Sequence, residues 1–265
     1  MQQRKPAISV RHLTCGYDDT VILDDISFDV MEGEIFIILG GSGCGKSTLL
    51  KNMIGLYQPM SGQVLFGEDD LAAASSAERI ALTRRFGVMY QMGALFGSMS
   101  LLQNVMLPLE EFTSLPAEAV DLIAKSKLAM VNLEHSLYKM PAALSGGMKK
   151  RAAIARAMAL DPKILFLDEP GAGLDPISSA ELDELILNLS RTLGITFVIV
   201  THELESIYAI ADRVIMLDRN VKRIVAEGDP KVLRDTSDNP FVRQFFHRLP
   251  SVPGEGAAQT TTEQG

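Results

Sequence analysis

The segment Gly40-Gly41-Ser42-Gly43-Cys44-Gly45-Lys46-Ser47-Thr48 constrains the fold of this chain more than any other. It matches the phosphate-loop pattern G-x-x-x-x-G-K-[ST] at every fixed position, between an apolar, β-branched run (34–39) and a run of helical periodicity (49–54). A glycine-rich loop can turn its backbone N–H groups toward phosphate oxygens, and the N-terminus of the following helix adds positive potential. The sequence therefore predicts that residues 40–48 hold a nucleotide, with Lys46 at its β- and γ-phosphates and the Ser47 hydroxyl on Mg²⁺.

The composition limits the classes of protein that this chain can belong to. It has 265 residues, 47% of them hydrophobic, which suits one large domain with an insertion. Its apolar runs are too short to cross a membrane, and the first residues lack a signal-peptide pattern, so a cytoplasmic protein is expected. The net charge of −8 argues against a nucleic-acid partner and against binding to anionic lipid by charge alone. Cys15 and Cys44 are expected to be free thiols.

Strand and helix patterns alternate along most of the chain. Between residues 92 and 160 the pattern is mainly helical, with breaks predicted at Pro108, Pro116 and Pro141, and this stretch reads as an inserted subdomain. Residues 250–265 are expected to be disordered. The other predicted strands are 8–13, 21–23, 26–30, 61–67, 87–90, 163–168, 195–200, 213–217 and 221–226, and the other predicted helices are 76–84, 177–192, 203–211 and 229–249.

Polar side chains follow several of the predicted strands. Asp168 and Glu169 end one of them, where a carboxylate can serve Mg²⁺ and a second can act as general base. Gln91 offers an amide oxygen to Mg²⁺ or to the attacking water, and His202 can hydrogen-bond a γ-phosphate. Taken singly, the acidic pair could be a solvated turn and the histidine a structural residue. Because a parallel sheet would bring all four to one edge beside Lys46, we expect a common site.

Two further features remain open on residue patterns alone. Ser145, Gly146 and Gly147 form a second helix start suited to phosphate, which one bound nucleotide does not need unless it belongs to another copy of the chain. Tyr17 lies in a predicted turn (16–19), where an aromatic ring could stack on adenine or be an ordinary surface residue.

In order and spacing, six of these motifs resemble those of ATP-binding cassette ATPases, over about residues 7–230. They are the Walker A loop (40–48), the Q-loop (Gln91), the signature (144–148), the Walker B strand (164–169), the D-loop (173–175) and the H-loop (His202). The resemblance implies the α/β fold of P-loop NTPases, with a RecA-like core sheet, an antiparallel β subdomain and an inserted α-helical subdomain. It implies an ATPase domain over 1–235 with its insert at about 92–160, a helical extension over 236–249, and a tail over 250–265.

The same resemblance implies roles for individual residues. In this family two ATP molecules with Mg²⁺ lie in a head-to-tail homodimer, each between the Walker A loop of one subunit and the signature of the other. Glu169 would then be the catalytic base and His202 the γ-phosphate switch, while Asp175 would act across the dimer. The remaining implied contacts are Tyr17 on adenine, Ser145, Gly146 and Gly147 on nucleotide, and Ser47, Gln91 and Asp168 on Mg²⁺. Met148 departs from the family, which mostly has Gln there.

A narrower resemblance concerns Leu-Ser-Gly-Gly-Met and the segment Gln91-Met92-Gly93-Ala94-Leu95-Phe96, which are similar to MlaF-type ATPases of Mla/Mce lipid transporters. It implies an ATPase on the cytoplasmic face of the inner membrane that powers phospholipid transport between inner and outer membranes. The implied partners are a MlaE-like permease and an MCE-domain protein (MlaD-like), and it leaves open a STAS-domain protein (MlaB-like). The segment after Gln91 would form the permease groove, or simply pack in the core. A transporter for another solute and a non-transport ATPase are the alternatives.

Overall fold

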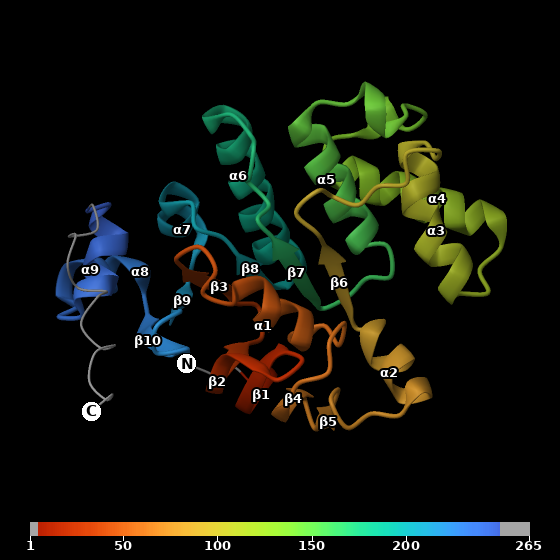
Figure 1. The fold of residues 1–265 in the computed structure, drawn as a ribbon. Coiled ribbons are helices and arrows are strands. Elements are labelled where there is room, and N and C mark those ends of the chain that lie inside the picture. The colour runs from red at the N-terminus through yellow and green to blue at the C-terminus, as the bar shows by residue number, and fades with distance from the viewer. Residues whose placement is uncertain (1–4, 250–265) are drawn as a thin grey trace, which may run out of the picture.

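The computed structural model describes residues 5–249 and is built around a six-stranded sheet (Figure 1). The strand order is β10-β9-β3-β8-β7-β6, and all neighbours are parallel except β10, which pairs antiparallel with β9. The parallel pairing places the carboxyl ends of β3, β6, β7 and β8 at one edge. The bounds are β3 (Ile35–Gly40), β6 (Phe86–Met89), β7 (Ile164–Asp168), β8 (Thr196–Val200), β9 (Arg213–Asp218) and β10 (Arg223–Gly228).

A four-stranded antiparallel sheet, in the order β2-β1-β4-β5, lies beside the phosphate loop (Figure 1). Its strands are β1 (Pro6–Tyr17), β2 (Thr20–Met31), β4 (Ser61–Phe66) and β5 (Asp69–Asp70). The sequence predicts three short strands where β1 and β2 run, because polar residues interrupt the hydrophobic pattern. The structure continues both strands through register shifts, which absorb those residues as β-bulges. The turn between β1 and β2 is correspondingly shorter than predicted, because Tyr17 and Thr20 already pair across the two strands.

Side chains of the six-stranded sheet are buried on both of its faces. Along β3, Ile35, Ile37 and Leu39 pack into one core cluster, while Phe36 and Ile38 pack into another with helix α1 (Lys46–Met53) and the antiparallel sheet. Successive side chains of a strand point to opposite faces, so a strand covered on both sides reads as an unbroken apolar run. This is why the strand before the phosphate loop can be predicted from the sequence.

The helical insert follows the short helix α2 (Ser76–Thr83). It contains α3 (Leu101–Phe112), α4 (Ala117–Met130), two 3-10 turns, η1 (Glu134–Ser136) and η2 (Pro141–Ala143), and α5 (Gly146–Ala157). Pro116 and Pro141 stand at helix starts, but the break predicted at Pro108 is wrong, because α3 continues through it. A single proline removes one backbone hydrogen bond, whereas Leu101, Val105 and Leu109 bury an apolar stripe along the same helix.

The chain after β7 supplies the remaining helices. They are α6 (Pro176–Leu193), α7 (Leu204–Ile210), α8 (Pro230–Thr236) and α9 (Pro240–His247). The helix predicted over 229–249 is therefore two helices, and Asn239 caps the second of them. No helix among residues 5–249 is long and apolar enough to span a membrane. The predicted tail (250–265) lies outside the described residues, and the division at residue 235 stays a prediction.

Candidate functional site

The phosphate loop leaves β3 and enters α1 through glycines that no other residue could replace. A Cβ on Gly40 would lie 2.4 Å from the carbonyl oxygen of Leu217, and Gly45 has a φ of 99° with the side chain of Ile22 2.9 Å from where its Cβ would stand. Lys46 Nζ folds back over the loop and donates to the carbonyl oxygens of Gly40 (2.9 Å) and Gly41 (3.1 Å). The loop therefore encloses an anion-sized nest with an ammonium at its rim.

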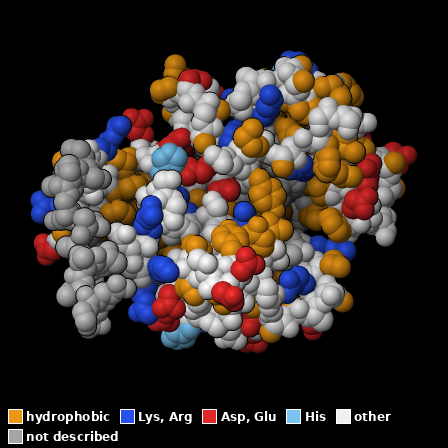
Figure 2. Space-filling model, viewed as in Figure 1, with side chains coloured by type: hydrophobic (Ala, Val, Ile, Leu, Met, Phe, Trp, Pro, Cys, Tyr) orange, Lys and Arg blue, Asp and Glu red, His pale blue; other side chains and the backbone are white. Residues whose placement is uncertain are grey.

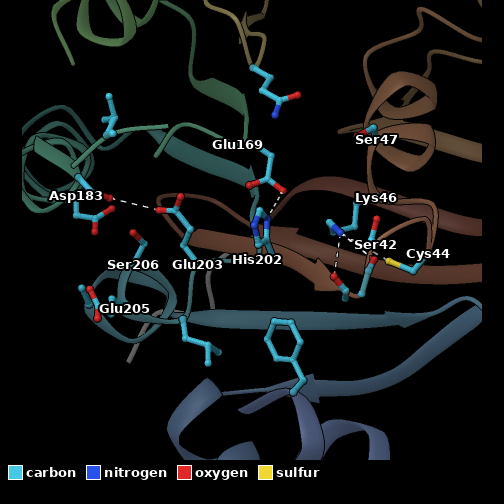
Figure 3. Close-up of a pocket in the computed structure, with 18 of the residues that line it drawn as sticks. Ser42, Cys44, Lys46, Ser47, Glu169, Asp183, His202, Glu203, Glu205 and Ser206 are labelled. Carbon is cyan, nitrogen blue, oxygen red and sulfur yellow. Dashed lines mark hydrogen bonds and ion pairs between the residues drawn. The ribbon is translucent and has the colours of Figure 1, made fainter. Parts of the chain in front are cut away.

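Glu169 and His202 form a hydrogen-bonded pair across the ends of β7 and β8 (Figure 3). The distance from Glu169 Oε1 to His202 Nδ1 is 2.8 Å, and Glu169 is 9% exposed. Its other oxygen, Oε2, is buried and accepts no hydrogen bond from the described residues. A buried carboxylate oxygen without a donor can take a proton from a nearby water, which is what a general base must do.

The three residues predicted to hold Mg²⁺ come from different elements of the same sheet edge. Ser47 lies in α1, Gln91 follows β6, and Asp168 ends β7. Asp168 Oδ1 is buried and accepts no hydrogen bond from the described residues, and burial, with Glu169 beside it, raises the pKa of Asp168. A divalent cation would offset both effects, so this chemistry suits Mg²⁺. Within residues 5–249 no three His, Cys, Asp or Glu side chains converge as metal ligands.

Tyr17 lies at the end of β1 beside the phosphate loop. Its hydroxyl is 3.0 Å from Thr48 Oγ1, and its ring meets the ring of Tyr57 edge-on, with centroids 5.6 Å apart. Tyr17 is 43% exposed, so it remains accessible to a ligand. Tyr57 was not predicted from the sequence, because the chain brings it back to Tyr17 only through the fold.

The signature residues lie apart from this loop. Ser145 caps α5, its hydroxyl accepting from the backbone N–H of Met148, and a Cβ on Gly146 would lie 3.2 Å from Leu174 of the neighbouring loop. In that loop Asp175 caps α6 by accepting from the N–H groups of Ile177 and Ser178. The predicted signature and D-loop are thus neighbours. Neither Ser145 nor Asp175 lines the phosphate-loop cavity, although Leu174 and Pro176 on either side of Asp175 do.

One cavity of about 1280 Å³ collects most of the predicted residues. It is lined by the phosphate loop, Tyr17, Gln91, Glu169 and His202, and its size suits a nucleotide. Its far wall includes residues that the sequence analysis missed, namely Asp183, Glu203, Phe245 and Arg248. Glu203 and the apolar stripe of α9 can be seen in the sequence, but no sequence pattern predicts that they face the phosphate loop.

Acidic side chains dominate the wall opposite Lys46 (Figure 3). Burial raises the pKa of Asp183 to about 6, Glu203 adds to the rise, and a hydrogen bond from Ser206 opposes it. Negative charge on this wall repels a triphosphate, whereas the loop attracts it. The electrostatics therefore favour phosphates at the Lys46 end of the cavity.

Comparison with known proteins identifies the family. The family model described as ABC transporter matches residues 23–172, more than half of the chain. The chain belongs to the ABC transporter family. It is an ATP-binding ATPase subunit of that family, as the motif resemblance implied, and the α/β fold with two sheets and a helical insert is confirmed.

Two curated relatives match nearly all of this chain. The intermembrane phospholipid transport system ATP-binding protein MlaF of Escherichia coli (strain K12) is 38% identical over 246 residues, which are 93% of this chain and 90% of that protein. The probable ribonucleotide transport ATP-binding protein mkl of Mycobacterium leprae (strain TN) is 41% identical over 241 residues, 91% of this chain but 69% of that longer protein.

A solved structure of the same kind is also similar. It is the dimeric, post-hydrolysis state of the ATP-binding cassette MJ0796 bound to ADP and Pi, with a TM-score of 0.75 and 29% identity over 84% of this chain and 98% of that one. The likeness extends through the whole cassette, so the two sheets and the helical insert are shared features.

Proposed function

We propose that this chain is the ATP-hydrolysing subunit of a transporter that moves phospholipid between an inner and an outer membrane. The observation that carries the chemistry is the Glu169–His202 pair facing the phosphate loop across one cavity. The lipid assignment is supported by similarity to MlaF over 90% of that protein's length, whereas mkl is matched over 69%.

Each predicted residue has a task that its position permits. Loop N–H groups and Lys46 bind the phosphates, with Lys46 released from the two loop carbonyls that it contacts. Ser47, Gln91 and Asp168 would hold Mg²⁺, whose charge neutralises the β- and γ-phosphates. Glu169 Oε2 takes a proton from the attacking water, while His202 orients the carboxylate through Oε1 and has a second ring nitrogen for the γ-phosphate. Tyr17, which is partly exposed, stacks on adenine.

The proposed working unit is a head-to-tail homodimer. Ser145, Gly146 and Gly147 do not line the phosphate-loop cavity of their own chain, which supports a role toward the nucleotide of a partner subunit. A capped helix start with bare N–H groups suits that task, and Asp175 sits beside it. The similar MJ0796 cassette, a dimer, gives a precedent for pairing of two cassettes.

We assign the exposed apolar segment after Gln91 to a membrane permease. Met92 is 88% exposed and Phe96 is 50% exposed, and hydrophobic side chains gather on this face beside α3, α4 and α5 (Figure 2). An apolar surface of this kind suits a partner helix. The protein would then sit peripherally on the cytoplasmic face of the inner membrane, with a MlaE-like permease, a MlaD-like MCE protein and, in a complete system, a MlaB-like STAS protein.

A second substrate follows from the mkl similarity. That protein is named as a probable ribonucleotide transport ATP-binding protein, and its identity to this chain, 41%, slightly exceeds that of MlaF. The ATPase machinery would be the same for ribonucleotide as for lipid. The cargo is therefore the point on which the two candidates differ.

The test is to tag the chain in its native cell, extract it in mild detergent, and identify co-purifying proteins and lipids by mass spectrometry. A permease and an MCE protein with bound phospholipid are expected, and a Lys46→Ala variant that still assembles shows that recovery does not depend on turnover. A permease that binds ribonucleotide would replace the lipid assignment. A chain without any membrane partner would overturn the transport proposal.

A further inference from the structure

Lys150 joins three functional segments from the interior of the protein. It lies one turn into α5 and is 7% exposed. Its ammonium donates to the backbone carbonyl of Gln91 (2.5 Å) and to that of Glu169 (3.1 Å). One side chain on the signature helix thereby touches both the segment after β6 and the residue proposed as base.

Helix α5 is itself held firmly against that segment. Gly87 of β6 lets the helix approach so closely that a Cβ there would lie 2.0 Å from the carbonyl oxygen of Ala157. Further along the segment, Arg156 donates to the carbonyl oxygens of Gly93 (3.0 Å) and Ala94 (2.7 Å). These hydrogen bonds tie residues 91–94 to α5. Lys150 is the residue through which α5 contacts the backbone of Glu169.

The backbone of Glu169 needs such support. Its φ is +47°, a left-handed conformation that is unfavourable for a residue with a Cβ. Its N–H donates to the carbonyl oxygen of Val200 (2.8 Å), and its carbonyl accepts from Lys150 and from the N–H of Ala172 (3.2 Å). Together with the bond to His202, these contacts determine where the carboxylate points.

Burying a charged ammonium group at this position is energetically unfavourable. Burial lowers the pKa of Lys150, and the nearby carboxylates of Glu169, Glu203 and Asp168 oppose that effect. Replacing a buried charge with an apolar residue of similar volume is often neutral or stabilising, so packing alone does not explain a lysine here. Its donors, aimed at two carbonyl oxygens of different loops, do explain it.

We propose that Lys150 is a positioning residue for ATP hydrolysis. It holds the carboxylate of Glu169 in its working orientation and passes displacements of residues 91–96, the segment assigned to the permease, to that carboxylate. The proposal rests on the proposed function for the role of Glu169 and for the partner of residues 91–96.

The experiment compares Lys150→Met with Lys127→Met in the full chain. Lys127 is equally buried, at 6%, but pairs with Asp161, which follows the helical insert, so it controls for the loss of a buried lysine. We measure phosphate release, the Kd of a fluorescent ATP analogue, and hydrogen exchange of peptides covering 89–97 and 168–172. K150M should lower kcat by about 10- to 100-fold with the Kd nearly unchanged, and should speed exchange in both peptides. K127M should leave both kcat and the exchange rates of these peptides close to the wild-type values.

A second variant keeps the test decisive if K150M does not fold. Lys150→Gln retains a donor without the charge, and its kcat should fall between those of the wild type and K150M, again with the Kd kept. Wild-type kcat in K150M, or in K150Q where K150M is unfolded, would overturn the proposal, as would an equal loss in K127M or a loss of kcat matched by the loss of ATP affinity. A wild-type chain that hydrolyses no ATP would instead overturn the proposed function.

Discussion

At the scale of single residues, the site is defined by a few polar groups whose partners are unusual. Glu169 combines a left-handed backbone with one hydrogen-bonded carboxylate oxygen and one that accepts no hydrogen bond from residues 5–249, and Asp168 beside it has a buried oxygen in the same situation. Such features are costly in a folded protein, and they cluster where chemistry requires them. They make residue-specific predictions that packing alone would not make.

Replacing Glu169 with Gln should remove proton acceptance while keeping the bond to His202. We expect the rate of phosphate release to fall by about 100-fold or more, with ATP affinity retained. Glu203→Gln makes the same change in a carboxylate of the same cavity and should stay close to the wild-type rate. Undiminished turnover in E169Q would remove Glu169 from the role of base.

Tyr17 tests adenine stacking against the contact with Thr48. If the ring supplies the binding energy, Tyr17→Phe keeps the affinity for ATP, whereas Tyr17→Ala weakens it by about tenfold. Equilibrium titration of both variants with a fluorescent ATP analogue measures the difference. An equal loss in both variants would point to the hydroxyl, which lies 3.0 Å from Thr48 Oγ1.

At the scale of elements, the packing of helices on the central sheet decides which groups reach the cavity. Helix α6 brings Asp183 beside α7, where Ser206 donates to it and Glu203 repels it. Neither helix contains a sequence motif that predicts this contact. The resulting rise in the pKa of Asp183 to about 6 ties the stability of the α6–α7 contact to pH.

The sign of that pH dependence follows from proton binding. Between an ordinary carboxyl pKa of 3.8 and the folded value of about 6, the folded chain binds more protons at Asp183 than the unfolded chain does. This group therefore makes stability fall as pH rises through that window. Asp183→Asn abolishes the effect, so its Tm relative to the wild type should rise by about 3 °C from pH 4 to pH 7. A pH-independent Tm difference in a thermal-shift series would contradict this.

At the scale of the whole molecule, the proposed function divides the ATP site between two separate parts of the chain. The phosphate loop lines the cavity, while the capped start of α5 lies elsewhere on the chain. A site divided in this way is complete only when two copies meet head to tail. ATP should therefore control the oligomeric state.

The dimer is best tested in the slow E169Q background. With ATP and Mg²⁺, light scattering after size exclusion should give twice the monomer mass, and without nucleotide it should give the monomer. Adding Ser145→Arg should keep ATP binding but prevent dimer formation, whereas Glu118→Arg, on the first turn of α4, should not. A dimer that persists in the Ser145→Arg variant would contradict the head-to-tail arrangement.

The sequence by itself determined the parts of this protein that depend on local chain geometry. The phosphate loop, the acidic pair after β7 and the alternation of strands and helices are legible because each depends on residues only a few positions apart. The parallel sheet that they imply places Lys46, Gln91, Glu169 and His202 along one cavity, while Asp168, predicted with them, is not among its lining residues. The errors were local too, at Pro108 and in the lengths of β1 and β2, where tertiary packing overrode the sequence signal.

Only the tertiary structure decided the contacts that join distant parts of the chain. Lys150 meets Gln91 across 59 positions, and Tyr17 meets Thr48 across 31. No periodicity or motif encodes such pairs, because they depend on how α5 and β1 pack against the two sheets. Burial and the carboxylates around each site then determine the pKa shifts of Lys150 and Asp183. These depend on three-dimensional distance and dielectric surroundings, which a linear sequence does not carry.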